Sequence, residues 1–196
     1  TLPFIILVSG YGKVNIARAI QYVDTKYCID KLVITGNTGS LDETTAPIGT
    51  VGISTAGLQY DVDFVALGAE PYALLNQDVN TYDADDNLIT KARGAAIVAD
   101  ETVNTGLFAT ADQFLANTAE ATALQTDTTA LFVDTSTASA AQIAYFNQIP
   151  YVAVKGVSNY AGDDAVAQYN ANVNEANQNA NNVVYQLLIN LIGINQ

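Results

Sequence analysis

The chain has 196 residues, of which 49% are hydrophobic and 14% are charged, and its formal net charge is −13. This is enough apolar material for one domain with a sizeable core and too much for intrinsic disorder. The acidic balance repels phosphate backbones and anionic lipid surfaces, and the seven basic residues are scattered. We therefore expect a single domain over residues 1–196, soluble and cytoplasmic, with neither nucleic acid nor membrane as a partner.

Missing residue types exclude several kinds of site. The sequence has no histidine and one cysteine, Cys28, which excludes an internal disulfide, a Cys/His metal cluster and a His-based triad. We expect no metal and no cofactor, and we interpret Cys28 as a small core residue near a helix end. The acidic residues Asp83, Asp85 and Asp86 lack the glycine and glutamate of a calcium loop and are predicted to be solvated. Met and Trp are also absent, which indicates either selection or an inaccurately recorded sequence.

Apolar segments of strand type alternate with helical patterns along the chain. Strands are predicted at Leu2–Val8, Lys31–Thr35, Gly52–Thr55, Tyr60–Ala66, Thr105–Thr110, Leu131–Val133 and Tyr151–Val154. Helices are predicted at about 14–26, 86–99, 138–147 and 165–191, with a short one from 112. The glycine-rich residues 36–39 should end the second strand, and the long loop 70–85 should cap a site or a partner. This alternation predicts an α/β domain with a mixed, mostly parallel twisted sheet flanked by helices.

Four segments carry a family resemblance, namely Val8–Asn15 (VSGYGKVN), Ile34–Leu41 (ITGNTGSL), Gln59–Gly68 (QYDVDFVALG) and Val152–Ala161 (VAVKGVSNYA). In order and spacing they resemble the 5′-methylthioadenosine/S-adenosylhomocysteine nucleosidases of the nucleoside phosphorylase superfamily, over nearly the whole chain. The resemblance implies a three-layer nucleoside-phosphorylase-like domain and hydrolysis of the N-glycosidic bond of an adenine nucleoside. The family's opening strand, which carries a glutamate that activates water, has no counterpart before Thr1.

Hydrolysis of this bond needs an acid at purine N7, contacts that steady a ribosyl cation, and a base that activates water. The resemblance places Asn159, after Ser158, where the family has its general-acid aspartate. An amide can donate a hydrogen bond to N7 but cannot transfer a proton. Asn159 also suits a strand-end residue that caps the following turn, and the sequence favours that interpretation.

The ribose-binding glutamate of the family aligns with Ser136 in the stretch Asp134-Thr135-Ser136. A hydroxyl is shorter and neutral, so it cannot make the bidentate, charge-assisted contact that a carboxylate makes. Ser136 equally suits a helix N-cap before Ala138. Asp134 could replace it as a ribose partner only if the loop shifts.

The residues expected to hold the base match the family more fully than the residues expected to act as the acid or to bind the ribose. Phe114 and Leu115 match the place where the family stacks an aromatic ring on adenine, although Phe114 could equally belong to the core. Thr38 and Gly39 match the turn that approaches the ribose, and a glycine permits a close backbone approach. Lys13 is interpreted as a solvated residue at a helix start, since its surroundings lack the Walker spacing.

Three functions remain open. The chain could be a nucleosidase whose active residues are hidden by a truncated start or an inaccurate sequence. It could be a catalytically weakened relative that binds purine nucleosides, or a structural, filament-forming or storage protein that reuses the fold. The expected ligand is a small adenine nucleoside. The resemblance also implies a homodimer or larger homo-oligomer, in which the apolar segment Leu67–Leu75 closes the 5′ end of a neighbour's site.

Overall fold

The computed structural model describes residues 4–75, 77 and 79–193. Its strands are β1 (Leu32–Ser40), β2 (Val51–Gln59), β3 (Thr81–Asp83), β4 (Val103–Thr110), β5 (Phe132–Asp134) and β6 (Tyr151–Tyr160). Its helices are α1 (Lys13–Tyr27), α2 (Asp86–Ala99), α3 (Thr118–Thr128), α4 (Thr137–Phe146) and α5 (Ala165–Ile192), with a short 3₁₀ turn, η1 (Val65–Leu67). Most predicted elements are present, and several of the strands are longer than their apolar cores.

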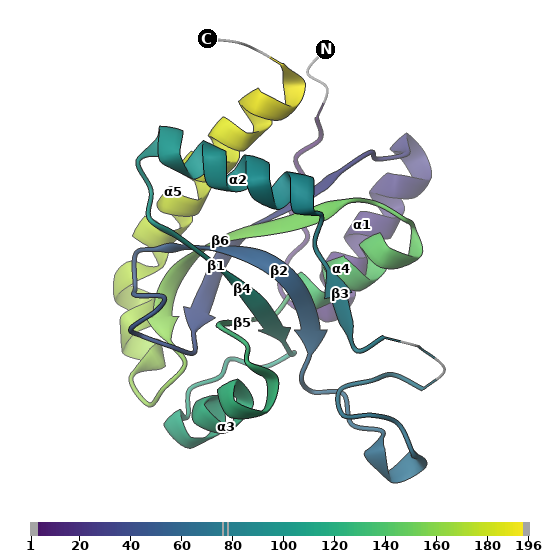
Figure 1. Cartoon of the computed structure of the whole chain (residues 1–196), viewed down its shortest axis with the longest axis vertical. Coiled ribbons are helices and arrows are strands. Elements are labelled where there is room, and N and C mark those ends of the chain that lie inside the picture. Colours follow the sequence, from purple (N-terminus) through teal and green to yellow (C-terminus); the bar gives the residue numbers. More distant parts are fainter. Residues whose placement is uncertain (1–3, 76, 78, 194–196) are drawn as a thin grey trace.

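The strands form one mixed sheet in the order β3-β2-β4-β5-β1-β6, and β2 also pairs with β6, so that the sheet closes on itself. The pairs β1–β6, β2–β4 and β4–β5 are parallel, and they include the two longest ladders of the sheet. The pairs β1–β5, β2–β3 and β2–β6 are antiparallel. Helices surround this sheet (Figure 1), which confirms the predicted α/β class and its flanked, mixed sheet. Closure of the sheet was not predicted.

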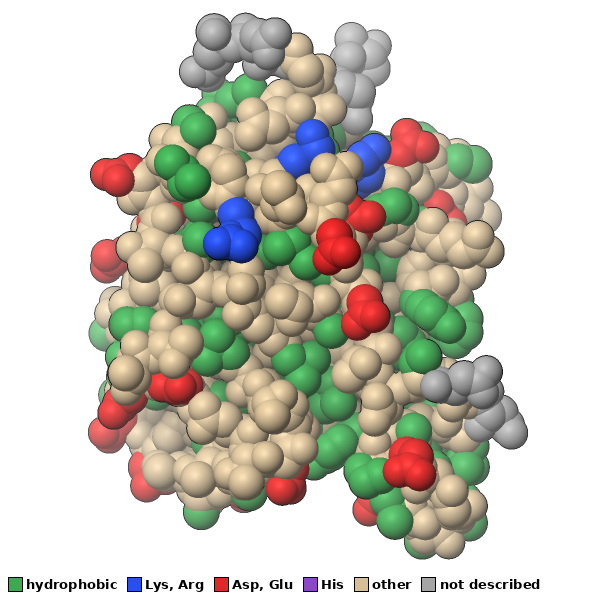
Figure 2. Space-filling view, viewed as in Figure 1, with side chains coloured by type: hydrophobic (Ala, Val, Ile, Leu, Met, Phe, Trp, Pro, Cys, Tyr) green, Lys and Arg blue, Asp and Glu red, His purple; other side chains and the backbone are tan. Residues whose placement is uncertain are grey.

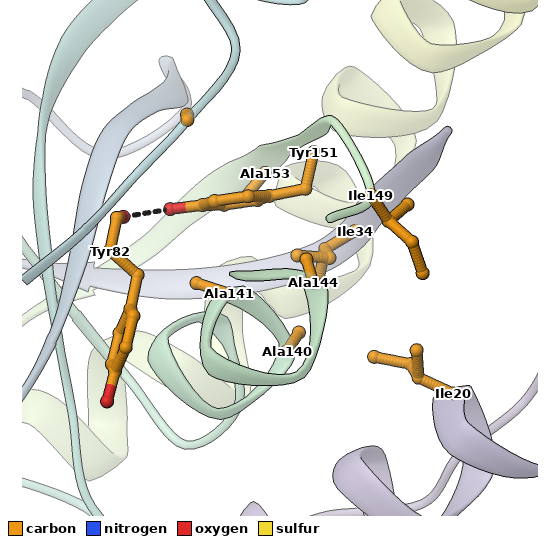
Figure 3. Close-up of a cluster of buried hydrophobic side chains, with 10 residues drawn as sticks. Ile20, Ile34, Tyr82, Ala140, Ala141, Ala144, Ile149, Tyr151 and Ala153 are labelled. Atoms are coloured by element: carbon orange, nitrogen blue, oxygen red, sulfur yellow. Dashed lines mark hydrogen bonds between the residues drawn. The ribbon is translucent and has the colours of Figure 1, made fainter. Parts of the chain in front are cut away.

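Two helix pairs cover the sheet from different sides. On one side, Ile20 of α1 and three small residues of α4 pack against Ile34 and Ala153 of the sheet (Figure 3). In the same cluster the Tyr151 hydroxyl donates a hydrogen bond of 2.5 Å to the Tyr82 carbonyl, which ties β6 to β3. On the other side, α2 and α5 bury a second cluster against β2 and β6. Small residues on α4 let this helix approach the strands closely.

Aromatic side chains fill the interior of the closed sheet. The rings of Phe108 and Phe132 stack with centroids 4.6 Å apart, and both are fully buried. Gly52 lies beside them, because a Cβ at this position would come within 2.8 Å of the Phe132 ring. The strand therefore needs a glycine here to leave room for the ring pair.

The predicted strand Leu2–Val8 is wrong for the residues described, and Leu2 lies outside them. Residues 4–10 form neither a strand nor a helix. Ile6 is 80% exposed and Val8 is 90% exposed. A strand exists only where its backbone groups pair with a neighbour, and no strand pairs with this segment in the described part of the chain.

Two other predicted elements are wrong because aspartates redirect the chain. The segment Tyr60–Ala66 alternates like a strand, but β2 ends at Gln59 and the chain turns. Asp63 accepts a hydrogen bond of 3.1 Å from the Val65 amide, which starts η1. No helix begins at Asp112; α3 begins six residues later, after the N-cap Asn117. Short acidic side chains compete with strand and helix ladders by bonding nearby amides.

The glycine-rich residues 36–39 do not end β1. They continue the parallel ladder with β6, with a register shift between Thr38 and Gly39. Cys28 is also not a core residue: it is exposed and forms the left-handed C-cap of α1 with φ 50°. The end of the helix was predicted correctly, but Cys28 follows it as an exposed C-cap and does not pack in the core.

Acidic side chains are spread over the surface, and one face of the molecule shows them beside few basic ones (Figure 2).

Loop 70–85 contains the short strand β3. Together with residues from Leu67 onward it lines a second hollow of about 450 Å³, which shares no lining residue with the pocket described below. Among the described residues, no helix has the length and apolar character needed to cross a bilayer.

Candidate functional site

A hollow of about 110 Å³ opens where the carboxyl ends of β1, β5 and β6 meet the loop that follows β4. We call it the strand-end pocket. Its floor consists of the buried lining residues Thr38, Gly39, Leu115, Val133, Asp134 and Asn159, and its rim consists of the more exposed Tyr11, Asn37, Gln113, Phe114, Thr135 and Tyr169. Strand carboxyl ends are the usual place for ligand sites in α/β proteins.

Most of the residues predicted from the sequence meet in this pocket. Thr38, Gly39, Phe114, Leu115, Asp134, Thr135 and Asn159 all line it. Ser136 and Ser158 do not line it, although each bonds to a residue that does. Segments that are more than 100 residues apart in the sequence thus converge at one point.

Asn159 lies at the pocket floor and is only 3% exposed. Its Oδ1 accepts a hydrogen bond of 2.8 Å from the Ser158 hydroxyl, and its Nδ2 donates one of 3.1 Å to the Tyr160 carbonyl. The residue belongs to β6 and does not cap a turn, contrary to the favoured interpretation of the sequence. An amide has two N–H donors, so one donor remains to meet a ligand atom.

The residues beside Asn159 come from the irregular end of β1. The Thr38 hydroxyl donates a hydrogen bond of 2.9 Å to the Val133 carbonyl, which joins β1 to β5. A Cβ on Gly39 would lie 3.1 Å from Val133 Cγ1 and 3.2 Å from Asn159 Nδ2. A side chain at position 39 would therefore crowd the pocket floor, and glycine keeps this floor open.

Aromatic rings form one wall of the pocket. Phe114 is 49% exposed, so it is not a core residue, whereas Leu115 is 6% exposed. The Phe114 ring meets the Tyr169 ring edge to face, with centroids 5.6 Å apart. An exposed ring held by a second ring offers a flat apolar surface on which a planar base can stack.

Asp134 is buried in a dense polar network. Its carboxylate forms an ion pair with Lys155, and both side chains are less than 5% exposed. It also accepts hydrogen bonds from the hydroxyls of Thr110, at 2.6 Å, and Thr137, at 2.5 Å. Burial on its own would raise the pKa of Asp134, but the Lys155 charge and these hydrogen bonds outweigh it and hold the pKa below its usual value. The carboxylate is ionised and fully engaged with the protein.

Ser136 takes part in the same network. It occupies the N-cap position of α4, as the structural interpretation of the sequence expected, but its side chain makes no capping hydrogen bond. The Lys155 ammonium donates a hydrogen bond of 2.6 Å to Ser136 Oγ instead. Lys155 therefore holds both the buried carboxylate and the hydroxyl next to it.

A second charged cluster fixes the loops of the rim. Lys13 Nζ lies 2.6 Å from Asp61 Oδ1, so Lys13 is an ion-pair partner rather than only a solvated residue. Its backbone amide donates a hydrogen bond of 2.7 Å to Asp112 Oδ1. The Asp112 amide in turn donates one of 3.2 Å to Asp61. These contacts join the start of α1 to the loop that carries Gln113 and Phe114.

Sequence reasoning assigned no role in the site to Tyr11, Tyr169 and Lys155. Tyr11 and Tyr169 line the rim, and Lys155 organises the network beside the floor. Tyr11 could have been noticed as an aromatic residue between two glycines of a recognised motif. Tyr169 and Lys155 gave no signal, because one lies in a long helix and the other inside an apolar strand.

The pocket offers no evident place for a metal. Within the described residues, no group of three or more His, Cys, Asp or Glu side chains could hold an ion. Asp85, one of the acidic residues considered in the sequence, accepts a hydrogen bond of 2.8 Å from the Leu88 amide and caps α2. The site can thus stack a planar ring and donate hydrogen bonds from an amide and hydroxyls.

A family model described as the phosphorylase superfamily matches residues 1–192. The chain therefore belongs to the phosphorylase superfamily, and the nucleosidase resemblance is confirmed by its relatives.

Two relatives are 5′-methylthioadenosine/S-adenosylhomocysteine nucleosidases. The protein of Anoxybacillus flavithermus is 30% identical over 191 residues, covering 95% of this chain and 80% of the relative. That of Staphylococcus carnosus is 28% identical over 188 residues, covering 95% and 82%. The nucleosidase of Neisseria meningitidis, solved with methylthio-immucillin-A, superposes with a TM-score of 0.87 at 25% identity, over 92% of this chain and 78% of that one.

Proposed function

We propose that this protein binds adenine nucleosides in the strand-end pocket and hydrolyses their N-glycosidic bond much more slowly than an intact nucleosidase. The observation that carries the proposal is the meeting of the Phe114 wall, Gly39 near the end of β1 and Asn159 in one pocket. The family membership and the nucleosidase relatives support it. In this proposal the base stacks on Phe114 and Leu115 and its N7 faces Asn159.

The proposed loss of rate begins with the leaving group. Adenine departs easily only if N7 is protonated as the bond breaks, and the Asn159 amide can donate a hydrogen bond there but cannot supply a proton. Loss of a general acid costs about 10²–10⁴ in rate. The hydrogen bonds from Asn159 to the base would still favour binding.

The incomplete contacts to the ribose should lower the rate of hydrolysis further. A carboxylate that accepts hydrogen bonds from both ribose hydroxyls would stabilise the ribosyl cation. Asp134 is engaged by Lys155 and by two threonines, and Ser136 is neutral and bonded to the same lysine. We assign this loss a factor similar to that of the acid, so that turnover falls by at least ~10⁴-fold.

We also propose that the chain acts as one domain and assembles as a homodimer. All four buried clusters pack on the same sheet, which favours one folding unit. The segment from Val65 carries exposed apolar side chains: Val65 is 52% exposed and Leu67 is 70% exposed. An isologous interface would cover them. Sedimentation at micromolar concentration should give a dimer, and a stable monomer would contradict this assembly.

Calorimetric titration of adenine and methylthioadenosine tests the proposed binding. We expect dissociation constants of roughly 0.1–1 mM, because the pocket is small and the ribose contacts are incomplete. Phe114→Ala should weaken binding about 10-fold through the lost stacking. Phe146→Ala removes a similarly exposed ring outside the pocket and should change nothing. An absence of binding by both ligands would contradict the proposal and favour the structural or storage role.

A further inference from the structure

The first amide of α1 is bound by an aspartate from a distant loop. The amides of the first turn of a helix have no partner within the helix, and Gly12, at the N-cap position of α1, has no side chain that could accept from them. The Lys13 amide instead donates a hydrogen bond of 2.7 Å to Asp112 Oδ1, across 99 residues of sequence. The partial positive charge at a helix N-terminus also favours a carboxylate there. Asp112 therefore caps α1 from the loop that carries Phe114.

Glycine at position 12 permits this contact. Gly12 has φ 91°, which is a left-handed conformation, and a Cβ there would lie 2.9 Å from Asp112 Oδ1. A side chain at this position would strain the turn and push the carboxylate away from α1.

The same aspartate is also held through its backbone. The Asp112 amide donates a hydrogen bond of 3.2 Å to Asp61 Oδ2, while Lys13 Nζ lies 2.6 Å from Asp61 Oδ1. The side chains of Lys13 and Asp61 are 20% and 29% exposed, so this ion pair is partly shielded from water. The next residue, Gln113, donates a hydrogen bond of 3.1 Å to the Tyr60 hydroxyl. The chain is thus held by a carboxylate, an amide and a side chain just before it reaches the aromatic wall of the pocket.

This support matters because Phe114 is itself 49% exposed. The buried residues on either side of this short loop are Ala111 and Leu115, and between them the loop is held by the polar contacts of Asp112 and Gln113. A ring adds fully to affinity only if it is already held in its stacking position, since ordering it during binding lowers the affinity.

We propose that Asp112 is a positioning residue, which orders the loop between Ala111 and Leu115 and so holds the Phe114 ring ready to stack on the base. Asp112 does not line the pocket, so it acts through Phe114. This inference rests on the proposed binding of adenine nucleosides and identifies the contact that preorganises their stacking surface.

The test measures the affinity for adenine by NMR titration of the full chain and its variants. Asp112 is exposed, so Asp112→Ala should fold, and it should weaken adenine binding about 5-fold, the effect of one lost cap. Asp112→Asn keeps an oxygen that caps helices as well as aspartate does, so its affinity should stay within about 2-fold of the unsubstituted chain. When Phe114→Ala is already present, Asp112→Ala should change the affinity by less than about 2-fold, because the ring that it positions is absent.

Asp85→Ala is the matched control, since Asp85 caps α2 through a hydrogen bond of 2.8 Å from the Leu88 amide and does not line the pocket. It should lower the melting temperature about as much as Asp112→Ala does and leave adenine affinity unchanged.

Three results would overturn the inference while adenine binding by the unsubstituted chain still upholds the proposed function. They are an unchanged affinity in Asp112→Ala, an equal loss of affinity in Asp112→Asn or Asp85→Ala, and an undiminished effect of Asp112→Ala when Phe114→Ala is present. Failure of the unsubstituted chain to bind adenine would overturn the inference together with the proposed function.

Discussion

Lys155 and Asp134 form a buried ion pair that joins the middle of β6 to the end of β5 beside the strand-end pocket. Burial of two charges is costly, and the pair is tolerated because hydroxyls and amides satisfy the remaining positions on the carboxylate. The network therefore supports the pocket but also keeps the carboxylate away from a ligand.

Removing one member of this pair should be more damaging than removing both charges. We expect Lys155→Met to lower the free energy of unfolding by about 3–5 kcal/mol, because it leaves an unpaired buried carboxylate. The double variant Lys155→Met/Asp134→Asn should lose less than the sum of the two single variants. Denaturant unfolding of all four proteins measures the coupling. Strict additivity would show that the two residues do not stabilise each other.

The same pair predicts the acid sensitivity of the fold. Because the folded-state pKa of Asp134 is lowered, the unfolded chain binds this proton more readily than the folded one. The stabilising contribution is thus complete above the unfolded value of about 3.9 and is lost as the pH falls through the folded pKa. The Asp134→Asn variant should lose less stability than the unsubstituted chain between neutral pH and that acidic range.

Asp42 provides a comparison for that experiment. Hydrogen bonds from the Thr45 hydroxyl and amide lower its pKa as well, but it lies outside the buried network. Asp42→Asn should change the pH dependence of unfolding by much less than Asp134→Asn. Chemical denaturation at a series of pH values gives both results, and a larger effect at position 42 would contradict the role assigned to the buried pair.

Gly156 is the glycine that the packing requires most strictly. A Cβ at this position would lie 1.8 Å from the carbonyl oxygen of Ala176 in α5, so Gly156→Ala must push the helix away from β6. We expect a loss of more than about 3 kcal/mol or a failure to fold. Gly94→Ala is the control, because nothing lies within 4 Å of its Cβ, and alanine should stabilise α2 by roughly 0.5–1 kcal/mol. Thermal melting of the two variants should show shifts of opposite sign.

Cys28 should react as an exposed thiol. It is accessible at the C-cap of α1 with φ 50°, so one equivalent of thiol should titrate with Ellman's reagent in the absence of denaturant. Cys28→Gly should raise the stability by about 1 kcal/mol, since glycine adopts left-handed φ without a Cβ penalty. A thiol that reacts only after unfolding would contradict the exposed C-cap.

The fold was largely predictable because its helices and central strands have strong apolar periodicity. In α5, for example, the buried Ala176, Ala180 and Leu187 repeat at helical spacing. The strands were predicted too short because residues such as Thr38 and Asn159 are polar yet buried. They belong to strands that end at a site, where partners supplied by other segments replace the apolar pattern.

The failures have a common physical cause. Tyr60–Ala66 has a strand pattern, but Asp61 bonds to Lys13 and to the Asp112 amide, which are distant in the sequence. Local periodicity cannot show such contacts. In the same way, the family resemblance implied that Ser136 contacts the ribose, but only the fold shows that Lys155 binds its hydroxyl.

The most direct test of the central claim is the rate of adenine release from methylthioadenosine, measured for this chain and for the Staphylococcus carnosus relative under identical conditions. The chain should release adenine at least ~10⁴-fold more slowly, since Asn159 cannot protonate the leaving base and the ribose lacks a free carboxylate. Asn159→Asp together with Ser136→Glu should recover only a small part of this loss. Release at a rate comparable to that of the relative, from protein whose sequence is verified by peptide mapping, would contradict the account.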